Sequence, residues 1–464
     1  MNLNKSTPIT LTIEKLAFPG KSIAYLTHNE NKMVVFLDEG LPGDQIEAQI
    51  SKIKKNYLEA KVTKYLKNSP EKITPKCIHF EKCGGCIWQN LIYENQLKYK
   101  NEFVAETLKH LGNQENYELK KIIPCDNQFY YRNKMEFSFG YDQENKFSIG
   151  LHQKHRKYDI LNIENCLLES EESNIIRNEI STFCQEKNLI PYNFKENSGL
   201  LRSLFIREGK NTKEILVNFA ISHENFEFEE ALIKLIEKIN QKLKEKQVTS
   251  LYLTKISVQK GRRTTIEEKL LFGNKILPEE MGVLDKKLKF AIHPQSFFQP
   301  NTIQAQKLYA EIIKSLELKG SEIVYDLFCG TGTISLFTAL FTKKVYGIEL
   351  SEDAIHDAIE NAKLNQIKNI EFICGDCTKE IKNLTEKPDA IIIDPPRSGL
   401  NEKLIEKIIA YNSPKILYVS CNPATQARDL KIFTEKKYKL KFAQPIDMFP
   451  NTYHIENIAY LEKK

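Results

Sequence analysis

Short apolar runs alternate with helical stretches along the last third of the chain. Five near-continuous apolar runs recur from about residue 300, and segments with helical periodicity separate them. Strands without a polar face are buried on both sides, as in a parallel sheet that is covered by helices. The pattern therefore predicts a doubly wound α/β domain over residues 291–464. The five runs are IVYDLFCG, VYGIEL, IEFICGD, AIIIDPP and ILYVSCN.

The first 68 residues have a different pattern, with short strands and frequent turns. Between residues 9 and 65 we expect five strands, separated by turn signals at Pro19-Gly20, His28-Asn29 and Gly40-Leu41-Pro42-Gly43. Five short strands in so few residues predict a small OB-like β-barrel over residues 1–68. This kind of barrel often binds oligonucleotides.

A third pattern fills the middle of the chain. Alternating strands and one long charged helix, at about residues 224–246, predict an antiparallel sheet with helical cover. Another helical stretch lies within residues 91–120, and this helix can pack on the C-terminal domain. We therefore expect a central α+β, RNA-binding domain over residues 91–290, preceded by a cysteine-rich segment at residues 69–90.

Composition narrows the class of protein. A chain of 464 residues with 41% hydrophobic residues is long enough for roughly three domains. It has no apolar window of about 18 residues and no basic-then-apolar N-terminus, so we expect a cytoplasmic protein without a membrane span. One basic cluster is usually a solvated surface, whereas several together favour a polyanionic partner. The clusters are Lys52, Lys54, Lys55, Lys61, Lys64 and Lys67, and then Arg202, Arg207, Lys260, Arg262 and Arg263.

A glycine-containing turn follows the first strand of the predicted α/β domain. In VYDLFCGTGTISL, Gly330 and Gly332 let the backbone approach a ligand closely. Glu349 ends the next strand, where a carboxylate can bind two ribose hydroxyls, and Asp376 ends the third, where it can meet an adenine edge. The third glycine of a dinucleotide motif is missing. Each of these strand ends by itself is usually an ordinary connection from a strand to a helix. Together, the glycines and the carboxylates favour S-adenosylmethionine, which has a ribose and an adenine but no pyrophosphate.

A thiol stands at the end of the fifth apolar run. Cys421 follows Ser420, and Asn422-Pro423 then breaks the strand. Free cysteines are usually buried as small hydrophobic residues, but polar neighbours and a rigid proline suit a nucleophile at the edge of a pocket.

Ten cysteines in a cytoplasmic protein indicate metal binding, catalysis or burial rather than disulfides. Cys77, Cys83 and Cys86 have the spacing C-x5-C-x2-C, and Gly84-Gly85 lets the chain wrap tightly. A fourth ligand must come from elsewhere in the chain. Four thiolates suit zinc or an iron–sulfur cluster, and spacing alone slightly favours zinc. The candidates for the fourth ligand are Cys125, Cys166 and Cys184, with His79 as a weaker one.

Four motifs, in this order, resemble those of the RNA uracil-5-methyltransferase family: DLFCGTGT, IIIDPPRSGL, VSCNPATQARD and HIENI. The resemblance covers nearly the whole chain, and the N-terminal barrel resembles the TRAM module of that family. It implies a Rossmann-like catalytic domain that binds S-adenosylmethionine through Gln299, Phe328, Glu349 and Asp394, with Asp376 as an addition.

The same resemblance implies a reaction and two further assignments. Addition of the Cys421 thiolate to C6 of uracil makes C5 electron-rich, so that it can take a methyl group before a base removes the C5 proton, and Arg397 or a backbone amide can stabilise the enolate. Glu456 is the general base, and His454 orients it or the substrate; since TYHIENIAYL alternates, we expect both on one face of a strand. The cysteines hold a 4Fe–4S cluster, with Cys166 as the fourth ligand beside Cys77, Cys83 and Cys86. The cluster has a structural or RNA-contacting role, because methyl transfer has no redox step.

Aromatic and basic residues alternate in FYYRNKMEFSF, where Tyr130, Tyr131, Arg132 and Lys134 can stack on unpaired bases and hold phosphates. The resemblance implies a monomeric enzyme that acts on 23S ribosomal RNA, because it has both the barrel and the four cysteines. The alternatives are a transfer RNA uracil-5-methyltransferase, a methyltransferase that acts on an exocyclic amine, and a non-catalytic RNA-binding factor for ribosome assembly.

Overall fold

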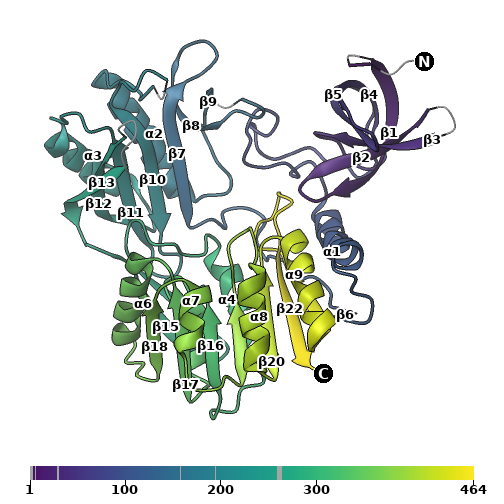
Figure 1. Ribbon diagram of the computed structural model, residues 1–464. Helices are drawn as coiled ribbons and strands as arrows, with labels where there is room; N and C mark the ends of the chain where they lie inside the picture. Colours follow the sequence, from purple (N-terminus) through teal and green to yellow (C-terminus); the bar gives the residue numbers. More distant parts are fainter. Residues whose placement is uncertain (1–3, 6, 29–30, 157, 194, 259–263) are drawn as a thin grey trace.

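Three bodies make up the chain (Figure 1). The computed structural model describes every residue except 1–3, 6, 29–30, 157, 194 and 259–263. The basic residues Lys260, Arg262 and Arg263 therefore lie outside the described residues. Figure 1 shows a barrel and a central sheet side by side above the third, α/β body. Among the residues described, no helix has the length and apolar character needed to cross a membrane.

The N-terminal body is a closed five-stranded β-barrel. Leu11 and Ile13 of β1 point inward and are nearly fully buried, together with Ile46 and Ala48 of β4. Side chains of alternate residues therefore fill the barrel interior. The order of strands is β1-β2-β3-β5-β4, with β1 (Pro8–Ala17), β2 (Lys21–His28), β3 (Asn31–Leu37), β4 (Gln45–Ile53) and β5 (Tyr57–Lys67).

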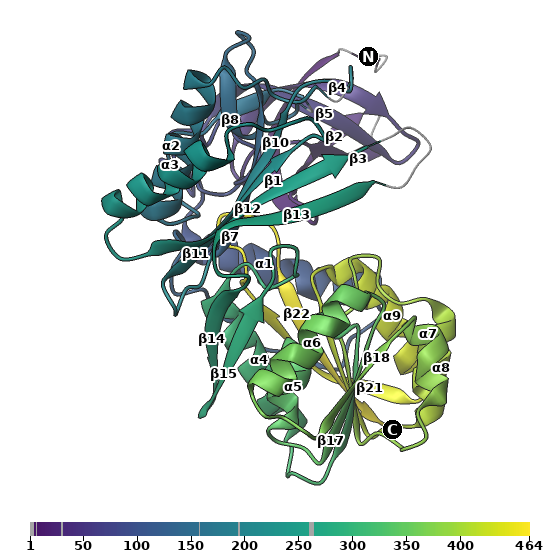
Figure 2. The ribbon, with the colours of Figure 1, turned by 90° about the vertical axis from the view of Figure 1, so that its left-hand side faces the viewer.

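A seven-stranded sheet forms the central body, and Figure 2 shows α2 and α3 on one of its faces. The pairing is antiparallel except between β11 and β12, which are parallel because α3 carries the chain back between them. The sheet order is β13-β12-β11-β10-β7-β8-β9. The elements are β7 (Lys134–Tyr141), β8 (Phe147–His152), β9 (Ile160–Asn162), α2 (Glu171–Glu186), β10 (Leu201–Glu208), β11 (Glu214–Ile221), α3 (Glu229–Lys242), β12 (Gln247–Ser257) and β13 (Thr265–Gly273).

The charged helix α3 is shorter than the predicted range 224–246, because apolar residues at both of its ends leave the helix to enter the core. Phe226 is buried before the helix begins. Leu243 is also buried and has extended backbone, with a ψ angle of 142°. The hairpin β14 (Leu277–Val283) and β15 (Lys286–Ile292) then leads from the central sheet into the third body.

The C-terminal body is an eight-stranded sheet with helices on both faces. Its order is β18-β17-β16-β19-β20-β22-β21-β6, and the five strands from β18 to β20 are mutually parallel. From β16 the chain adds strands on one side, to β17 and β18, and then returns to the other side of β16 with β19 and β20. The order of the strands therefore reverses between β16 and β19. The predicted fold class, a doubly wound α/β domain with an N-terminal barrel and a central α+β body, is confirmed. The elements are α4 (Thr302–Leu316), β16 (Ile323–Leu327), α5 (Thr333–Ala339), β17 (Lys344–Glu349), α6 (Glu352–Leu364), β18 (Ile370–Cys374), α7 (Cys377–Glu380), η1 (Ile381–Asn383), β19 (Ala390–Ile393), α8 (Glu402–Tyr411), β20 (Lys415–Ser420), α9 (Pro423–Lys436), β21 (Tyr438–Ile446) and β22 (Glu456–Lys463).

The seven strands from β18 to β21 in this sheet supply side chains to two cores. Val324 of β16 packs with residues of α4 and α5, whereas Tyr325 packs on the opposite face with residues of α8 and α9. Helix α1 (Tyr93–His110) contributes Val104 and Leu108 to this second core and contacts α9, so it packs on the C-terminal body although it precedes the central sheet. The two-residue strand β6 (Glu118–Leu119) then adds to the edge of the sheet beside β21.

A buried ion pair fastens α1 to the connection between β21 and β22. The Lys100 Nζ atom lies 2.6 Å from Asp447 Oδ1, and both side chains are fully buried. Lys100 also donates a hydrogen bond to the carbonyl of Phe449, and the Tyr93 hydroxyl donates to the second oxygen of Asp447 at 2.8 Å. These partners satisfy the charges, which are costly to bury alone.

Replacing Lys100 with Met will destabilise the protein strongly, because Asp447 is left as an unpaired buried charge. We expect a loss of about 3–5 kcal/mol in the free energy of unfolding, measured by urea denaturation. The matched control is Lys15→Met, which breaks the exposed pair between Lys15 and Glu106 of the same helix and will cost less than about 1 kcal/mol. Equal losses in the two variants would contradict this account.

Candidate active site

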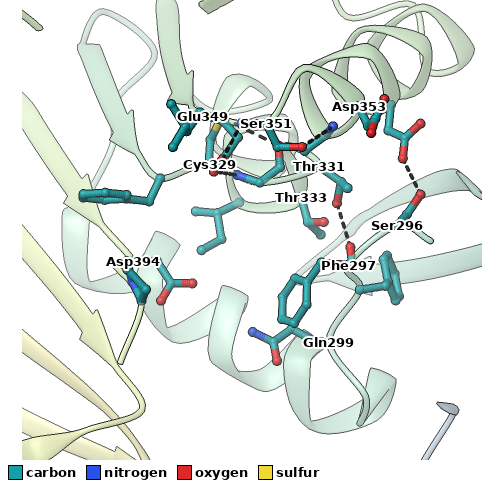
Figure 3. Close-up of a pocket in the computed structure, with 18 of the residues that line it drawn as sticks. Ser296, Phe297, Gln299, Cys329, Thr331, Thr333, Glu349, Ser351, Asp353 and Asp394 are labelled. Atoms are coloured by element: carbon teal, nitrogen blue, oxygen red, sulfur yellow. Dashed lines mark hydrogen bonds between the residues drawn. The ribbon is translucent and has the colours of Figure 1, made fainter. Parts of the chain in front are cut away.

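A large cavity lies at the carboxyl edge of the parallel strands. Its volume is about 1190 Å³, and it is lined by residues that follow β16, β17, β18, β19 and β20. In Figure 3 the side chains of Gln299, Glu349 and Asp394 point toward its interior from three separate segments. Ligands of open α/β sheets bind at this edge, beside the point where the strand order reverses. The structure brings all seven predicted catalytic and cofactor-binding residues to this cavity: Gln299, Phe328, Glu349, Asp376, Asp394, Cys421 and Glu456.

The turn between β16 and α5 depends on left-handed backbone. Gly330 and Gly332 have φ angles of 54° and 77°, and Phe328 has a φ angle of 65°, which is unusual for a residue with a side chain. A Cβ atom at Gly332 would lie 2.8 Å from the ring of Phe372 on β18, so the absence of a side chain at Gly332 lets the turn pack against this ring. Residues of the turn from Phe328 to Thr331 thereby line the cavity.

Glu349 is held by two backbone amides, one from this turn and one from the residues that follow β17. Its Oε2 atom accepts a hydrogen bond from Gly330 N at 3.2 Å, and its Oε1 atom accepts one from Ser351 N at 2.9 Å. Asp376 is exposed at the rim of the cavity, where its carboxylate caps α7 by accepting from Lys379 N at 3.2 Å. The two carboxylates thus have fixed positions before any ligand binds.

The central sheet holds the loop that carries Gln299. The carbonyl oxygen of Gln299 accepts a hydrogen bond from Asn133 Nδ2 at 2.8 Å. Arg207 of β10 donates to the carbonyls of His293 and Ser296, at 3.2 and 2.6 Å. Arg207 is only 1% exposed, so the prediction that it belongs to a surface for a polyanion is wrong. Its guanidinium is buried because it satisfies these backbone carbonyls.

The cavity is also lined by residues that no sequence motif predicts. The Ser296 hydroxyl donates to Asp357 of α6, and Thr331 donates to the carbonyl of Phe297 at 3.2 Å (Figure 3). His293 lies 3.6 Å from the same Asp357 carboxylate. These contacts join residues far apart in the chain, and no local motif marks them.

Cys421 is half-buried at the end of β20, and the residues after it explain the Asn-Pro pair. Asn422 caps α9 by accepting a hydrogen bond from Ala424 N at 3.1 Å, and Pro423 occupies the first turn, where no N–H is needed. Asn422 Nδ2 and the Thr425 hydroxyl both donate to the carbonyl of Arg397, at 3.0 and 3.2 Å. The helix start therefore fixes the thiol and ties it to the Asp-Pro-Pro-Arg turn.

Burial raises the pKa values of the acidic groups in the cavity. Burial and the nearby carboxyl groups of Glu456 and Asp394 raise the pKa of Cys421 to about 11, while Arg397 opposes the shift. The pKa of Asp394 is raised by burial to about 7. Glu456 is buried beside these groups. Burial, as the main cause, and the nearby Asp394 carboxyl group, as the second, hold the pKa of Glu456 well above its usual range. The thiol is therefore protonated at neutral pH, and burial favours the neutral form of the Glu456 carboxyl group.

His454 does not share a strand face with Glu456, contrary to the prediction. Strand β22 begins at Glu456, and its first six residues are all buried, because the strand supplies side chains to the cores on both faces of the sheet. An alternating pattern would require one exposed face. Burial, followed by the charge of Arg397, lowers the pKa of His454 to about 4, so its imidazole is neutral.

All four predicted cysteine ligands line a second, small cavity. Cys77, Cys83 and Cys86 meet Cys166 there, whereas Cys125 hydrogen-bonds Asn301 elsewhere and Cys184 is buried on α2. Burial raises the pKa values of Cys86 and Cys166 to about 12. Within the described residues, no group of three or more metal-binding side chains is placed closely enough to hold an ion as it stands. The donor set, four thiols around one largely apolar space, fits a thiophilic centre.

The predicted stacking residues separate into two environments. Tyr130 is 46% exposed, but Tyr131 is buried and donates a hydrogen bond to the carbonyl of Pro450, so the stacking role predicted for Tyr131 is wrong. Arg132 lines the large cavity. The pKa of Lys134 is lowered to about 8, mainly by burial and secondly by the charge of Arg207. The basic residues of β4, β5 and their connection are exposed: Lys52, Lys54, Lys55, Lys61, Lys64 and Lys67.

The family model described as tRNA (Uracil-5-)-methyltransferase matches residues 92–464, and that of the TRAM domain matches residues 7–63. The chain belongs to the uracil-5-methyltransferase family. The resemblance inferred from the sequence motifs is thereby confirmed.

Similar proteins span the whole chain. Proteins named uncharacterized RNA methyltransferase, from Clostridium tetani and Bacteroides thetaiotaomicron, are each 36% identical; the alignments cover 100% and 96% of this chain and 99% and 100% of the relatives. The crystal structure of Pyrococcus abyssi tRNA (uracil-54, C5)-methyltransferase in complex with S-adenosyl-L-homocysteine has a TM-score of 0.75 and 28% identity, and covers 98% of this chain and 100% of that chain.

The reactivity of Cys421 will depend steeply on pH. Only the thiolate is alkylated, so with a pKa of about 11 the rate of labelling by iodoacetamide will rise about tenfold per pH unit from pH 7 to 10. Glu456→Gln will speed labelling at a given pH, because one of the two carboxyl groups that add to the effect of burial on the thiol pKa is lost, and Arg397→Ala will slow it. Peptide mass spectrometry measures the rates, with the exposed Cys374 as an internal reference. Labelling of Cys421 as fast as that of Cys374 at pH 8 would contradict the shift.

Proposed function

We propose that this protein transfers the methyl group of S-adenosylmethionine to C5 of a uridine in structured RNA, through a covalent bond between Cys421 and C6 of the base. One observation carries the proposal. The thiol, the buried carboxyl group of Glu456 and the glycine-containing turn all line one cavity, which has room for a nucleoside beside the cofactor. A binding protein has no need for a thiol and a buried carboxyl group at this point.

The cofactor supplies an electrophilic methyl carbon next to the substrate. Glu349 is placed to bind its ribose hydroxyls, because the carboxylate is already oriented by two backbone amides. Asp376 stands at the rim for the adenine edge. Gln299, Phe328 and Asp394 line the same cavity and complete the proposed binding set.

Cys421 loses its proton and adds to C6 of uracil, and the electron pair of the C5–C6 double bond moves to the O4 enolate. Arg397, which is close enough to lower the pKa of the thiol, stabilises this negative charge. C5 then takes the methyl group as the sulfonium bond breaks. Glu456 removes the C5 proton, the double bond re-forms and the sulfur leaves, giving 5-methyluridine.

Burial of the acidic groups keeps the thiol unreactive until the cofactor binds. A carboxyl group with a raised pKa is a stronger base once ionised, and the raised pKa of Glu456 suits it to accept a proton from carbon. Binding a cation in the cavity lowers the pKa values of Cys421, Asp394 and Glu456, so the acidic groups ionise when the cofactor is bound. The free enzyme thereby keeps its thiol protonated and unreactive.

Cys77, Cys83, Cys86 and Cys166 would hold a 4Fe–4S cluster, with zinc as the alternative. Four cysteines around one small cavity support either centre. Such a cluster supplies redox chemistry in other proteins, but the methyl transfer has no electron to exchange. We assign these residues a structural role in the cytoplasmic, monomeric enzyme.

Two RNA classes are candidate substrates. The combination of a TRAM barrel and four cysteines favours 23S ribosomal RNA, as the sequence motifs imply. The likeness to the Pyrococcus abyssi enzyme, whose name specifies uracil-54 of tRNA, favours transfer RNA as the second candidate. In either case the base must leave its stack to reach Cys421. We assign the binding of the surrounding RNA to Tyr130, Arg132 and the exposed lysines of the barrel, and the exposure of Tyr130 and of the lysines supports this role.

An amine methyltransferase is the competing enzyme class. It would use Asp394-Pro395-Pro396 to hold an exocyclic amine, and it would need no cysteine. In this chain Arg397 follows the prolines, and its carbonyl is bound by residues of the Cys421 turn. This connection favours a reaction in which the thiol and the Asp-Pro-Pro-Arg turn act on one base.

Replacing Cys421 with Ala will abolish methyl transfer, because C5 is a poor nucleophile without the bond at C6. The loss should be at least about 10⁴-fold in kcat, measured with a labelled methyl donor and RNA. Wild-type protein will form a denaturation-resistant adduct with RNA that contains 5-fluorouridine, and the variant will not. Full turnover by Cys421→Ala would support the amine alternative, and Cys374→Ala is the matched control for loss of a thiol.

The class of RNA substrate can be identified by testing which RNA contains 5-methyluridine after the reaction. Purified protein with labelled cofactor and either 23S ribosomal RNA or transfer RNA, followed by nucleoside mass spectrometry, will give 5-methyluridine in ribosomal RNA. Label in transfer RNA alone would select the second candidate. No transfer to either RNA, naked or in precursor particles, would leave only the RNA-binding factor.

A further inference from the structure

The connection between β21 and β22, residues 447–455, forms one wall of the large cavity. We call this connection the catalytic loop. Phe449 of the catalytic loop lines the cavity, and so does Glu456, which directly follows the loop. His454 packs edge-on against Phe449, with 6.0 Å between the ring centroids. The position of the proposed general base therefore depends on what holds this loop.

Asn451 holds the catalytic loop at its midpoint. It is 1% exposed and has a φ angle of 66°, in the left-handed region that Asn tolerates. Its carbonyl oxygen accepts hydrogen bonds from the backbone N–H groups of Ile87 and Trp88, both at 3.0 Å. Its own N–H donates to Gln96 Oε1, and its side-chain amide donates to the carbonyl of Gln128, both at 2.8 Å. One residue thus connects three distant segments.

Two of these segments lead directly to the cysteine cavity. Ile87 and Trp88 come immediately after Cys86, which lines that cavity with the other three cysteines. Gln96 of α1 also binds this segment, because its amide donates to the carbonyls of Trp88 and Leu91 at 2.9 and 3.0 Å. A shift of the backbone at Cys86 must therefore move the donors that hold the catalytic loop.

The opposite end of the cavity is held by other partners. The turn after β16, Glu349 and the loop of Gln299 are fixed by Ser351, Asn133 and Arg207. These three residues lie outside the cysteine segment. Disturbance at the cysteines should consequently reach the base end of the cavity and spare the cofactor end.

We propose that Asn451 is a positioning residue through which the cysteine segment sets the geometry of the catalytic loop. When the four cysteines are held together, the backbone at Ile87 and Trp88 is fixed and the loop is ordered. When they are released, the loop loosens and Glu456 loses its alignment. The effect on turnover rests on the proposed function, whereas the effect on the order of the loop does not.

Amide hydrogen exchange tests the mechanical part on the full chain. In Cys86→Ser, peptides that cover residues 447–455 will exchange about tenfold faster than in the wild type, while peptides that cover residues 328–336 will not change. Cys184→Ser is the control for loss of a thiol, because Cys184 is buried but lies outside the cysteine cavity; residues 447–455 of this variant will stay protected. Wild-type protection of the loop in Cys86→Ser, or equal loss of protection in both regions, would overturn the proposal.

Kinetics test the positioning part. Gln96→Leu removes a partner of Asn451, whereas the control Gln114→Leu removes a buried amide that joins the chain after α1 to Thr434 of α9. Gln96→Leu will lower kcat by about 10–100-fold with the KM for S-adenosylmethionine unchanged within about twofold, and a methylated protein–RNA adduct will accumulate because proton removal is slow.

The possible failures can be told apart. A similar fall in kcat for both variants, or a rise in the KM for S-adenosylmethionine in Gln96→Leu, would overturn a positioning role for this contact. A wild-type protein that makes no 5-methyluridine would refute the proposed function alone. The exchange experiment would still decide whether the cysteine segment orders the loop.

Discussion

Parallel strands joined by helices must all end at the same edge of their sheet, and this constraint decides where the protein can act. The chain crosses the C-terminal sheet five times in one direction, and each crossing ends in a turn. The glycine turn, Glu349, Asp394 and Cys421 therefore converge from positions up to about a hundred residues apart. The reversal of strand order between β16 and β19 opens the edge there, because consecutive connections diverge to opposite faces.

Water exclusion then gives the convergent groups their chemical character. The same burial that makes the cavity suitable for a nucleobase raises the pKa values of Cys421, Asp394 and Glu456. Arg397 opposes these shifts for the thiol and for Glu456. The cavity is lined by more acidic groups than arginines, so it favours a bound positive charge, and such a charge in turn favours ionisation of the acidic groups.

The central sheet and the cysteine segment are not passive attachments to the catalytic body. Arg207 and Asn133 of the central body bind the backbone of the Gln299 loop, and Lys100 and Asn451 fasten the catalytic loop to α1 and the cysteine segment. Buried polar groups require specific partners, so these contacts allow little freedom between the bodies. The cavity consequently depends on residues that are far from the reaction.

The sequence by itself determined the elements and the ends of the strands. Apolar runs, glycines and strand-terminal carboxylates follow local rules of burial and backbone geometry, so the residue pattern alone predicts the α/β domain, the barrel and the positions of Glu349, Asp394 and Cys421. Only the tertiary structure decided the roles of Arg207, Tyr131 and His454, because whether an arginine or a tyrosine is buried depends on partners that are distant in the chain. Asn451 is the clearest case: its hydrogen bonds connect segments that are far apart in the sequence, and no local pattern can encode that.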